Sequence, residues 1–343
     1  MLAASRWFCC LTAFLVVVSG LMAADGHDEV WVTRAERPPR KVRVASALAD
    51  LRGPLEIRLA RLGTLLDDAV KSAGGAPLDL MVYPEFALQH ESGRNADERA
   101  IPFPAVEKEL GEIARRYRTW LVVPITLKED DGRVSNAAVL MDRQGRRAGV
   151  YRKTHPMIEH GTFEGGVTPG LEYPVFECDF GQLGVLICWD MGYPEAWAQL
   201  ARAGAELIAL PSASPQTLQP AAEALRHRVY VVTSTPRDNA SLFDPLGRTA
   251  AQVTTAPGVL VHQLDLSFAI LHWSETLENG HAFQRRFGDA VGHNYSTRED
   301  TGLFWSNDPQ RPIGSMVREL GLREMPVVVQ EIREAVRASR AAD

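Results

Sequence analysis

Three residues that together could perform nucleophilic catalysis each follow a short apolar run. They are Glu85 in DLMVYPEF, Lys153 in AGVYRKTHP and Cys188 in LGVLICWDMGYPE. A thiol attacks a carbonyl or nitrile carbon as the thiolate, so it needs a base to take its proton and a cation or N–H donors to hold the developing oxyanion. A glutamate, a lysine and a cysteine supply these roles, and the pattern predicts a cysteine hydrolase of carbon–nitrogen bonds.

The predicted nucleophile, Cys188, stands at the exit of a predicted strand, where its sulfur would project into a cleft. A free thiol titrates at pH ~8.5, and we expect a nearby ammonium and backbone N–H groups to lower that pKa. Glu85 would act as the general base, because a charge directly after an apolar strand and a proline is poorly placed to serve solubility alone. The simpler alternatives are a buried structural cysteine and a solvated loop carboxylate.

Lys153 would bind the oxyanion, assisted by the backbone N–H of Trp189 in the turn after the nucleophile. Its neighbour Arg152 should face the other way, since successive side chains of a strand point to opposite sides. Trp189, Asp190 and Tyr193 are predicted to line the pocket. The alternatives are a surface lysine, packing roles for the two aromatic residues, and a turn or cap role for Asp190.

The sequence predicts neither a metal nor a cofactor. His155 and His160 are close along the chain, but Pro156 interrupts a regular helix there and no recognised zinc spacing surrounds them. The chain also has no glycine-rich phosphate loop, no G-x-S-x-G elbow and no GxGxxG motif in a strand-turn-helix context.

Length and composition indicate a globular protein that acts on a small molecule. The chain has 343 residues, of which 45% are apolar, enough for one large domain or two smaller ones. A net charge of -6 leaves no basic surface for nucleic acid. A small, neutral or mixed-charge substrate is compatible with this composition.

Residues 1–24 have the pattern of a secretory signal peptide. Arg6 precedes an apolar core over residues 7–18, and the small residues Ser19-Gly20 and Ala23-Ala24 follow it. We therefore expect an exported protein, periplasmic or secreted. The alternative is an uncleaved membrane anchor, because the apolar stretch approaches spanning length if it extends to Ala24.

Cleavage of this segment would remove two of the four cysteines, Cys9 and Cys10. A disulfide between the remaining Cys178 and Cys188 is conceivable in an oxidising compartment. We expect both thiols to be free, because pairing would remove the thiolate. Cys178 is then a small buried apolar residue.

The elements that position the reactive residues follow from the hydrophobic spacing. Periodic apolar residues predict helices from Leu55 to Val70, stopped by Gly74 and Gly75, from Val106 to Tyr117, and from Pro194 to Ala203, ended by Gly204. Short apolar runs predict strands over residues 78–83, 120–125, 148–151, 182–187 and 206–210. Helices placed between strands and hairpin-like stretches indicate an α/β fold with a mixed sheet.

We divide the chain at changes in this pattern. Residues 25–40 are charged and contain two prolines, as is typical of a linker or an extended arm. The hydrolase domain is predicted over residues 41–266. Residues 267–343 show a weaker pattern and are predicted to form an extension that packs on the domain.

The order and local sequence of these segments resemble the nitrilase or carbon–nitrogen hydrolase superfamily, from about residue 41 to 266. The matching words are VYPE around Glu85, YRKTH around Lys153, TFEGGVTPG, and GVLICWDMGYPEAW around Cys188. LIALPSASP, LRHRVYVV and FDPLGRTAAQ follow in the family's order. One such word alone is weak evidence, whereas the ordered set is specific.

The resemblance implies several further properties. It implies a four-layer α-β-β-α sandwich with a Glu-Lys-Cys triad at the ends of neighbouring strands. It also implies a second glutamate between the lysine and the cysteine that orients the substrate. Glu164 is the best match, and Glu159 remains a rival because the spacing to Pro169 is one residue shorter than in many relatives. A homodimer or larger assembly, paired through helices next to the active site, is expected on the same grounds.

Within this family, Cys-Trp-Asp rather than Cys-Trp-Glu favours an amide or N-carbamoyl substrate, hydrolysed through a Cys thioester. Nitrile hydrolysis and N-acyl transfer on the same fold are rivals, although the N-acyltransferases carry several membrane spans and one candidate is present here. A Cys-His hydrolase of the glutaminase type is another rival. A catalytically inactive binding module is the alternative from a different class, and the intact Glu-Lys-Cys set argues against it.

Overall fold

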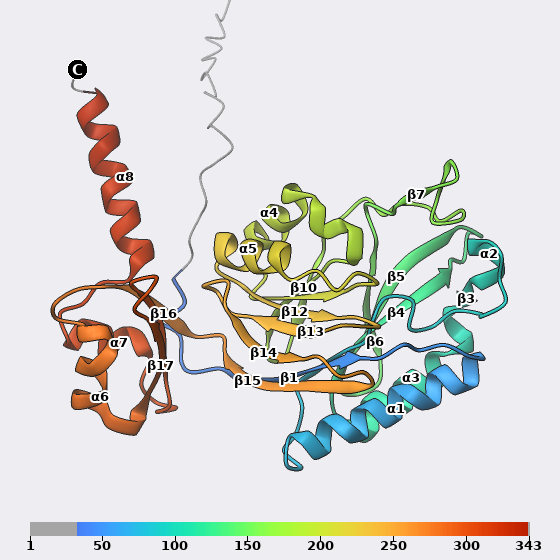
Figure 1. Ribbon diagram of the computed structural model, residues 1–343, viewed down its shortest axis with the longest axis horizontal. Coiled ribbons are helices and arrows are strands. Elements are labelled where there is room, and N and C mark those ends of the chain that lie inside the picture. Colours follow the sequence, from blue (N-terminus) through green and yellow to red (C-terminus); the bar gives the residue numbers. More distant parts are fainter. Residues whose placement is uncertain (1–32, 342–343) are drawn as a thin grey trace, which may run out of the picture. The chain divides into compact units, whose positions relative to one another are not determined.

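Two stacked β-sheets with helices on their outer faces organise residues 41–265 of the computed structural model, which describes residues 33–341 (Figure 1). This four-layer α-β-β-α arrangement is the predicted fold class. The predicted signal segment, residues 1–24, and the start of the predicted arm lie outside the described residues. The rest of the arm is anchored, since Arg37 and Arg40 bind the buried carboxylate of Glu206 at 2.7 and 2.9 Å.

The first sheet has the strand order β15-β1-β2-β4-β5-β6, and β3 pairs with β4. The pairs β1-β2, β2-β4 and β3-β4 are parallel and the other pairs are antiparallel, so the sheet is mixed. Its strands are β1 (Lys41–Leu48), β2 (Leu80–Val82), β3 (Ile101–Pro102), β4 (Trp120–Lys128), β5 (Val134–Met141), β6 (Arg147–Arg152) and β15 (Gly258–Asp265).

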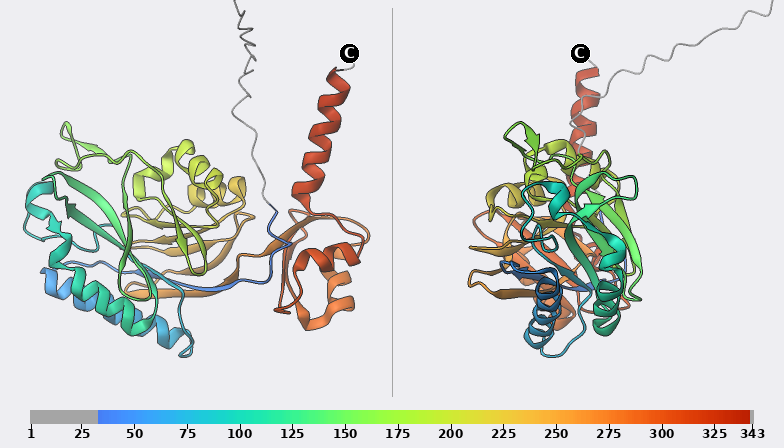
Figure 2. Two further views of the ribbon diagram at one scale, coloured as in Figure 1. Left: turned by 180° about the vertical axis from the view of Figure 1, so that it is seen from behind. Right: turned by 90° about the vertical axis from the view of Figure 1, so that its right-hand side faces the viewer.

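Both faces of the first sheet are buried. On β2, Leu80 and Val82 point into the core between the two sheets, whereas Met81 points into the core beneath the helices. Strand alternation separates the two sets, and burial on both sides explains the continuous apolar run. The covering helices are α1 (Leu55–Ser72) and α3 (Glu107–Tyr117), which lie together on one side of the sheets (Figure 2).

The second sheet has the strand order β14-β13-β12-β11-β10-β9, with β10, β11 and β12 parallel. Its strands are β9 (Val175–Cys178), β10 (Gly181–Val185), β11 (Leu207–Pro211), β12 (Tyr230–Ser234), β13 (Ala240–Phe243) and β14 (Thr249–Val253). Its outer face is covered by α4 (Pro194–Arg202) and α5 (Leu218–His227). Trp197 of α4 is fully buried in this layer.

Short elements connect the layers near the ends of the strands. They are α2 (Ala96–Arg99), η1 (Phe103–Ala105), β7 (Ile158–Glu159), β8 (Thr162–Phe163) and η2 (Cys188–Gly192). Strands β7 and β8 form a separate hairpin whose residues are exposed. The hairpin and η2 occupy the connections that follow β6 and β10.

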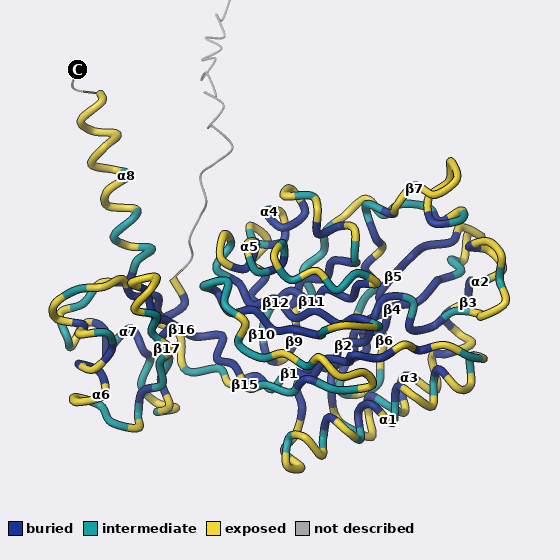
Figure 3. Tube along the Cα trace, viewed as in Figure 1, coloured by how far each residue is buried: buried dark blue, intermediate teal, exposed yellow. Residues whose placement is uncertain are grey.

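The C-terminal extension has its own sheet and its own core. The sheet, in the order β16-β18-β17, consists of β16 (Phe268–His272), β17 (Val291–Ser296) and β18 (Thr301–Ser306). Its helical elements are η3 (Glu278–Gly280), α6 (His281–Phe287), η4 (Gly288–Ala290), α7 (Ile313–Glu319) and α8 (Met325–Ala341). Phe283, Phe304 and Met316 are buried in this second core, and the outer part of α8 is exposed (Figure 3).

Most predicted elements are confirmed with small shifts at their ends. The predicted strand over residues 182–187 is too long, because β10 ends at Val185 and the chain turns away before Cys188. Cys178 and Cys188 are both free, as expected. No helix within residues 33–341 combines the length and apolar character needed to cross a membrane.

Candidate active site

Glu85 lies just beyond the carboxyl end of β2 and is 6% exposed. Its Oε1 accepts hydrogen bonds from Lys153 Nζ at 2.8 Å and from Asn136 Nδ2 at 2.9 Å. Its Oε2 accepts a hydrogen bond from the backbone N–H of Ala213 at 2.9 Å. The carboxylate is therefore held on both sides, with one oxygen on the ammonium and the other directed toward the connection after β11.

Lys153 follows β6, and its ammonium is shared by two carboxylates. Besides the contact with Glu85, Nζ donates to Glu164 Oε1 at 2.5 Å. Burial by itself would lower the pKa of Lys153, but the negative charges of the two glutamates that bind it outweigh this effect and the pKa is raised. The side chain is thus a buried, permanently charged cation.

Glu164 joins this cluster from the loop after β8. It is 8% exposed, and its Oε1 also accepts a hydrogen bond from the backbone N–H of Met157 at 3.1 Å. The chain turns sharply here, with φ of 44° at Glu164, 80° at Gly165 and 116° at Gly166, values that glycine adopts without steric cost. Of the two glutamates considered from the sequence, Glu164 contacts Lys153, whereas Glu159 is exposed on the hairpin.

Asn136, which sequence reasoning missed, connects the two glutamates. It lies on β5, all of whose residues are buried, and its Nδ2 donates to Glu85 Oε1 at 2.9 Å and to Glu164 Oε2 at 2.8 Å. Its Oδ1 is buried and has no hydrogen-bond partner within residues 33–341. An amide inside a mostly apolar strand was the signal that could have identified it, because buried polar groups need partners.

Cys188 begins η2 with a left-handed φ of 47° and is partly exposed. A non-glycine residue in this conformation is strained, and such strain is often found at functional sites. Leu186 and Ile187, which precede it, are fully buried. The segment that leads from β10 to the turn is therefore in the core, while Cys188 itself is partly exposed.

The expected lowering of the Cys188 pKa is wrong. Burial and the charge of Glu85 raise the pKa of the thiol to about 11, and Lys153, Ser212 and Ala213 only partly oppose them. The prediction failed because it counted the ammonium and not the desolvation or the nearby carboxylate. The resting group is consequently a protonated thiol that needs a base.

Ala213 is a neighbour of both the proposed base and the sulfur. Its N–H donates to Glu85 Oε2 at 2.9 Å, and it belongs with Ser212 to the neighbours of the Cys188 thiol that partly oppose the rise in its pKa. The charge of Glu85 also acts on that thiol. The segment after β11 therefore holds the carboxylate of the proposed base near the proton that it would take. Sequence reasoning noted the surrounding stretch LIALPSASP but neither residue.

Asp190 is fully buried, and its hydrogen bonds hold neighbouring segments of the site together. Its Oδ1 accepts from the backbone N–H of His155 at 2.8 Å, and its Oδ2 accepts from the Tyr151 hydroxyl at 2.7 Å and from the backbone N–H of Ile187 at 2.9 Å. It thus ties the turn that carries the cysteine to the segment on either side of Lys153. This is the turn role considered as the alternative, and the predicted pocket role does not fit its burial.

Trp189 is 44% exposed and is the second residue of η2. The first backbone hydrogen bond of this turn comes from the N–H of Asp190, so the N–H of Trp189 is not used within the turn. Tyr193 stacks on His155 with ring centroids 3.6 Å apart. His155 is therefore engaged by an aromatic ring and by Asp190. Within the described part of the chain, no group of three or more His, Cys, Asp or Glu residues is arranged to hold a metal.

Comparison with known protein families gives one match that covers most of the sandwich. The profile described as carbon-nitrogen hydrolase matches residues 55–270. A protein of Pseudomonas protegens named "Hydrolase in pqqF 5'region" is 32% identical over 210 residues, which are 59% of this chain and 65% of that protein. The deaminated glutathione amidase of Mus musculus is 30% identical over 210 residues, 53% of this chain and 60% of its own length. The chain thus spans less than two thirds of either relative.

Solved structures share the fold at lower identity. Nit3 of Saccharomyces cerevisiae, described as a member of branch 10 of the nitrilase superfamily, has a TM-score of 0.58 and 21% identity, covering 72% of this chain and 94% of its own. An amidase from Nesterenkonia sp. AN1 has a TM-score of 0.56 and 21% identity, covering 67% and 92%. In that structure the active-site cysteine carries the acetamide moiety of fluoroacetamide.

Proposed function

Because the chain belongs to the carbon-nitrogen hydrolase family, we propose that it hydrolyses the carbon–nitrogen bond of a small amide or N-carbamoyl substrate through a thioester on Cys188. The observation that carries the proposal is the buried cluster in which Lys153 binds Glu85 at 2.8 Å, with the partly exposed thiol of Cys188 near enough for both charges to act on its pKa. The amidase names of the relatives support the substrate class.

In the first half of the reaction, Glu85 takes the thiol proton as the sulfur bonds to the carbonyl carbon. The π electrons of the carbonyl move to its oxygen, which becomes an oxyanion. When this intermediate collapses, the carbon–nitrogen bond breaks and the nitrogen takes the proton back from Glu85. Ammonia or an amine leaves, and the acyl group stays on the sulfur.

In the second half, Glu85 takes a proton from water as the water oxygen attacks the thioester carbon. The carbon–sulfur bond breaks, the sulfur regains a proton, and the acid product leaves. A pKa of about 11 for Cys188 fits this cycle, since a base must act at the moment of attack and again on water.

Lys153 would stabilise the oxyanion in both halves, together with the backbone N–H of Trp189. The two carboxylates that hold Nζ keep the ammonium in place, so little reorganisation is needed as the charge develops. One such donor in a site that excludes water is worth ~2.7 to 4 kcal/mol of transition-state stabilisation.

We expect ammonia release when the protein is incubated with a panel of aliphatic primary amides and N-carbamoyl amino acids. The peptide that contains Cys188 should gain the mass of the acyl group in samples quenched during turnover. An aliphatic nitrile is the comparison substrate. Acid formation from the nitrile alone would move the function to nitrile hydrolysis, and no turnover of any substrate, with Cys188 never acylated, would favour an inactive binding module.

We also propose that the protein is exported after removal of residues 1–24 and forms a homodimer or larger homo-oligomer. The signal-like pattern of those residues supports export, and the exposed apolar residues Leu218 (86%) and Leu225 (43%) on α5 support pairing next to the site. Native mass spectrometry of the protein purified after expression of the full chain in a bacterial host tests both ideas. Retention of residues 1–24 would contradict export by cleavage, and a monomer would contradict the assembly.

A further inference from the structure

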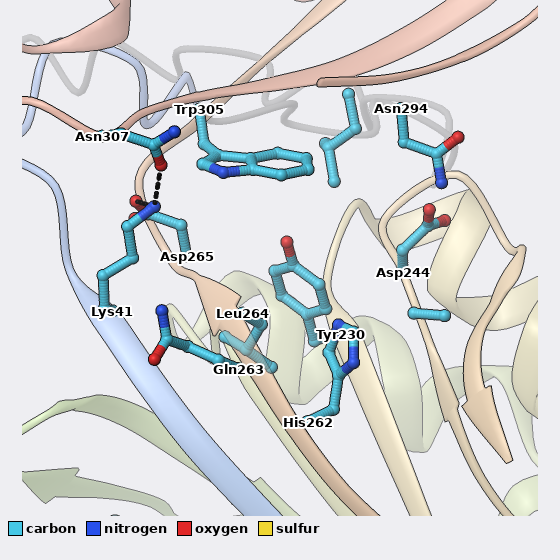
Figure 4. Close-up of a pocket in the computed structure, with 12 residues that line it drawn as sticks. Lys41, Tyr230, Asp244, His262, Gln263, Leu264, Asp265, Asn294, Trp305 and Asn307 are labelled. Atoms are coloured by element: carbon cyan, nitrogen blue, oxygen red, sulfur yellow. Dashed lines mark hydrogen bonds and ion pairs between the residues drawn. The ribbon is translucent and has the colours of Figure 1, made fainter. Parts of the chain in front are cut away.

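A cavity of about 310 Å³, separate from the candidate active site, lies where the sandwich meets the C-terminal sheet (Figure 4). Its walls come from β1, β12 and β15 on one side and from β17 and β18 on the other. None of the residues proposed for catalysis lines it. A volume of this size is at the lower end of the range for small-molecule sites, ~300 to 1,000 Å³.

The roof of the cavity is the indole ring of Trp305 on β18. Gly292 lies opposite it on β17, and a Cβ added at that glycine would come within 2.2 Å of Trp305 Nε1. Because glycine has no side chain, the indole can occupy the space above Gly292. Figure 4 shows the ring lying across the roof above the hydroxyl of Tyr230. The cavity thus has one flat aromatic surface in a fixed position.

The floor holds a polar group without a partner. Tyr230 is 4% exposed, and its hydroxyl, which points into the cavity, forms no hydrogen bond with any residue of the described range (Figure 4). Burial, reinforced by the charges of Asp244 and Asp265, raises the pKa of this phenol, so the hydroxyl remains a donor. The hydroxyl oxygen faces the open volume of the cavity, so water or a ligand can bind it there.

The side walls are polar but electrically balanced. Asp265 forms an ion pair with Lys41 at 3.1 Å, and Asp244 forms one with Arg248 at 2.8 Å. The side chains of His262, Gln263, Asn294 and Asn307 add further polar groups, and Asn307 accepts a hydrogen bond from Lys41 at 3.1 Å. Since each carboxylate is already neutralised, the cavity does not favour a strongly charged ligand. It offers donors and acceptors around its edge.

We propose that this cavity binds a neutral saccharide ring. The apolar C–H face of a pyranose would lie on the indole of Trp305, while its hydroxyls, each both donor and acceptor, would meet Tyr230 and the amides of the walls. A flat heterocycle would be held best between two aromatic ring faces. Between Trp305 and Tyr230 the cavity offers a single ring face, that of Trp305, because Tyr230 presents its hydroxyl and not its ring face (Figure 4).

The test uses the full-length protein and saturation-transfer NMR with D-glucose, D-galactose, N-acetyl-D-glucosamine and, as a planar comparison, adenosine. At least one sugar should bind the wild type with a dissociation constant on the order of 1 mM. Tyr230→Phe should weaken that binding by ~10-fold without lowering the thermal stability, because the hydroxyl has no protein partner to lose in the free protein.

Two further variants separate this site from the catalytic one. Trp305→Ala should abolish sugar binding while amide hydrolysis continues, and Cys188→Ala should bind the sugar as the wild type does. The proposal is overturned if no sugar binds, if the dissociation constant is unchanged in both Tyr230→Phe and Trp305→Ala, or if adenosine alone binds. None of these outcomes depends on whether Cys188 is the nucleophile.

Discussion

Turnover of every substrate that the wild type hydrolyses is expected to be lost in the Cys188→Ala variant, with kcat reduced by at least ~10⁴-fold. The variant retains Glu85 and Lys153 but has no atom that can form the thioester. A carboxylate and an ammonium alone would have to activate water directly against an unactivated amide. The measurement is ammonia release under saturating substrate, together with circular dichroism to establish that the fold is retained.

Cys178→Ala is the matched control for this substitution. Cys178 is 6% exposed on β9, away from the cluster, and burial raises the pKa of its thiol. Its replacement should lower the free energy of unfolding by ~1 kcal/mol through the lost buried atom and leave kcat unchanged. If Cys188→Ala stays within ~10-fold of the wild type, the thioester mechanism is wrong.

Apolar runs that end in a charged residue indicate where a buried strand emerges, so Glu85 and Lys153 could be singled out from local pattern. Their meeting was predicted from the resemblance to the carbon–nitrogen hydrolases, because β4 and β5 separate β2 from β6 in the sheet and no local signal shows this. Glu164 was likewise chosen through the resemblance, and the structure adds the sharp turn at the two glycines that positions it.

Asn136 and Ala213 could not be found in this way. The role of Asn136 depends on the register between β5 and β6, which sets its amide between two carboxylates that are far from it in the chain. Ala213 acts through its backbone N–H, which carries no side-chain signature. The direction of the Cys188 pKa shift also depends on how deeply the thiol is buried, and that quantity belongs to the folded chain.

The C-terminal extension was the least predictable part for a related reason. Strand β17 reads VGHNYS, with small and polar residues in place of the β-branched alternation that identifies a strand. Gly292 is in that strand because the indole of Trp305 needs the space, so a residue that weakens the local strand signal serves a tertiary contact. The cavity beneath the indole therefore could not be predicted from the local sequence pattern.

Lys153→Met is expected to reduce kcat by at least ~100-fold and to lower the free energy of unfolding by ~3 to 5 kcal/mol. The first effect is the lost oxyanion donor, and the second is the pair of buried carboxylates left without a cation. Because the pKa of Lys153 is raised in the folded state, its stabilisation is fully present below the ordinary lysine value of ~10.4 and is lost only as the pH rises through the higher folded value. Urea unfolding at neutral pH therefore measures the whole contribution.

Arg152→Met is the matched control, since Arg152 is the preceding residue and forms a partly exposed ion pair with Glu129 at 2.6 Å. It should change the free energy of unfolding by less than ~1 kcal/mol and leave kcat unchanged. A near-normal kcat in Lys153→Met would remove the ammonium from the mechanism.

Adding Glu85→Gln to Lys153→Met distinguishes a coupled charge cluster from two independent side chains. The glutamine removes one of the two uncompensated carboxylates, so the double variant should be more stable than Lys153→Met alone, with a coupling free energy of ~1 to 3 kcal/mol in a double-mutant cycle. Its kcat should not recover, because the base is now missing as well as the cation. Simple addition of the two destabilisations would mean that Lys153 does not hold Glu85 in place, and the shared ammonium would then be a feature of packing with no part in positioning the base.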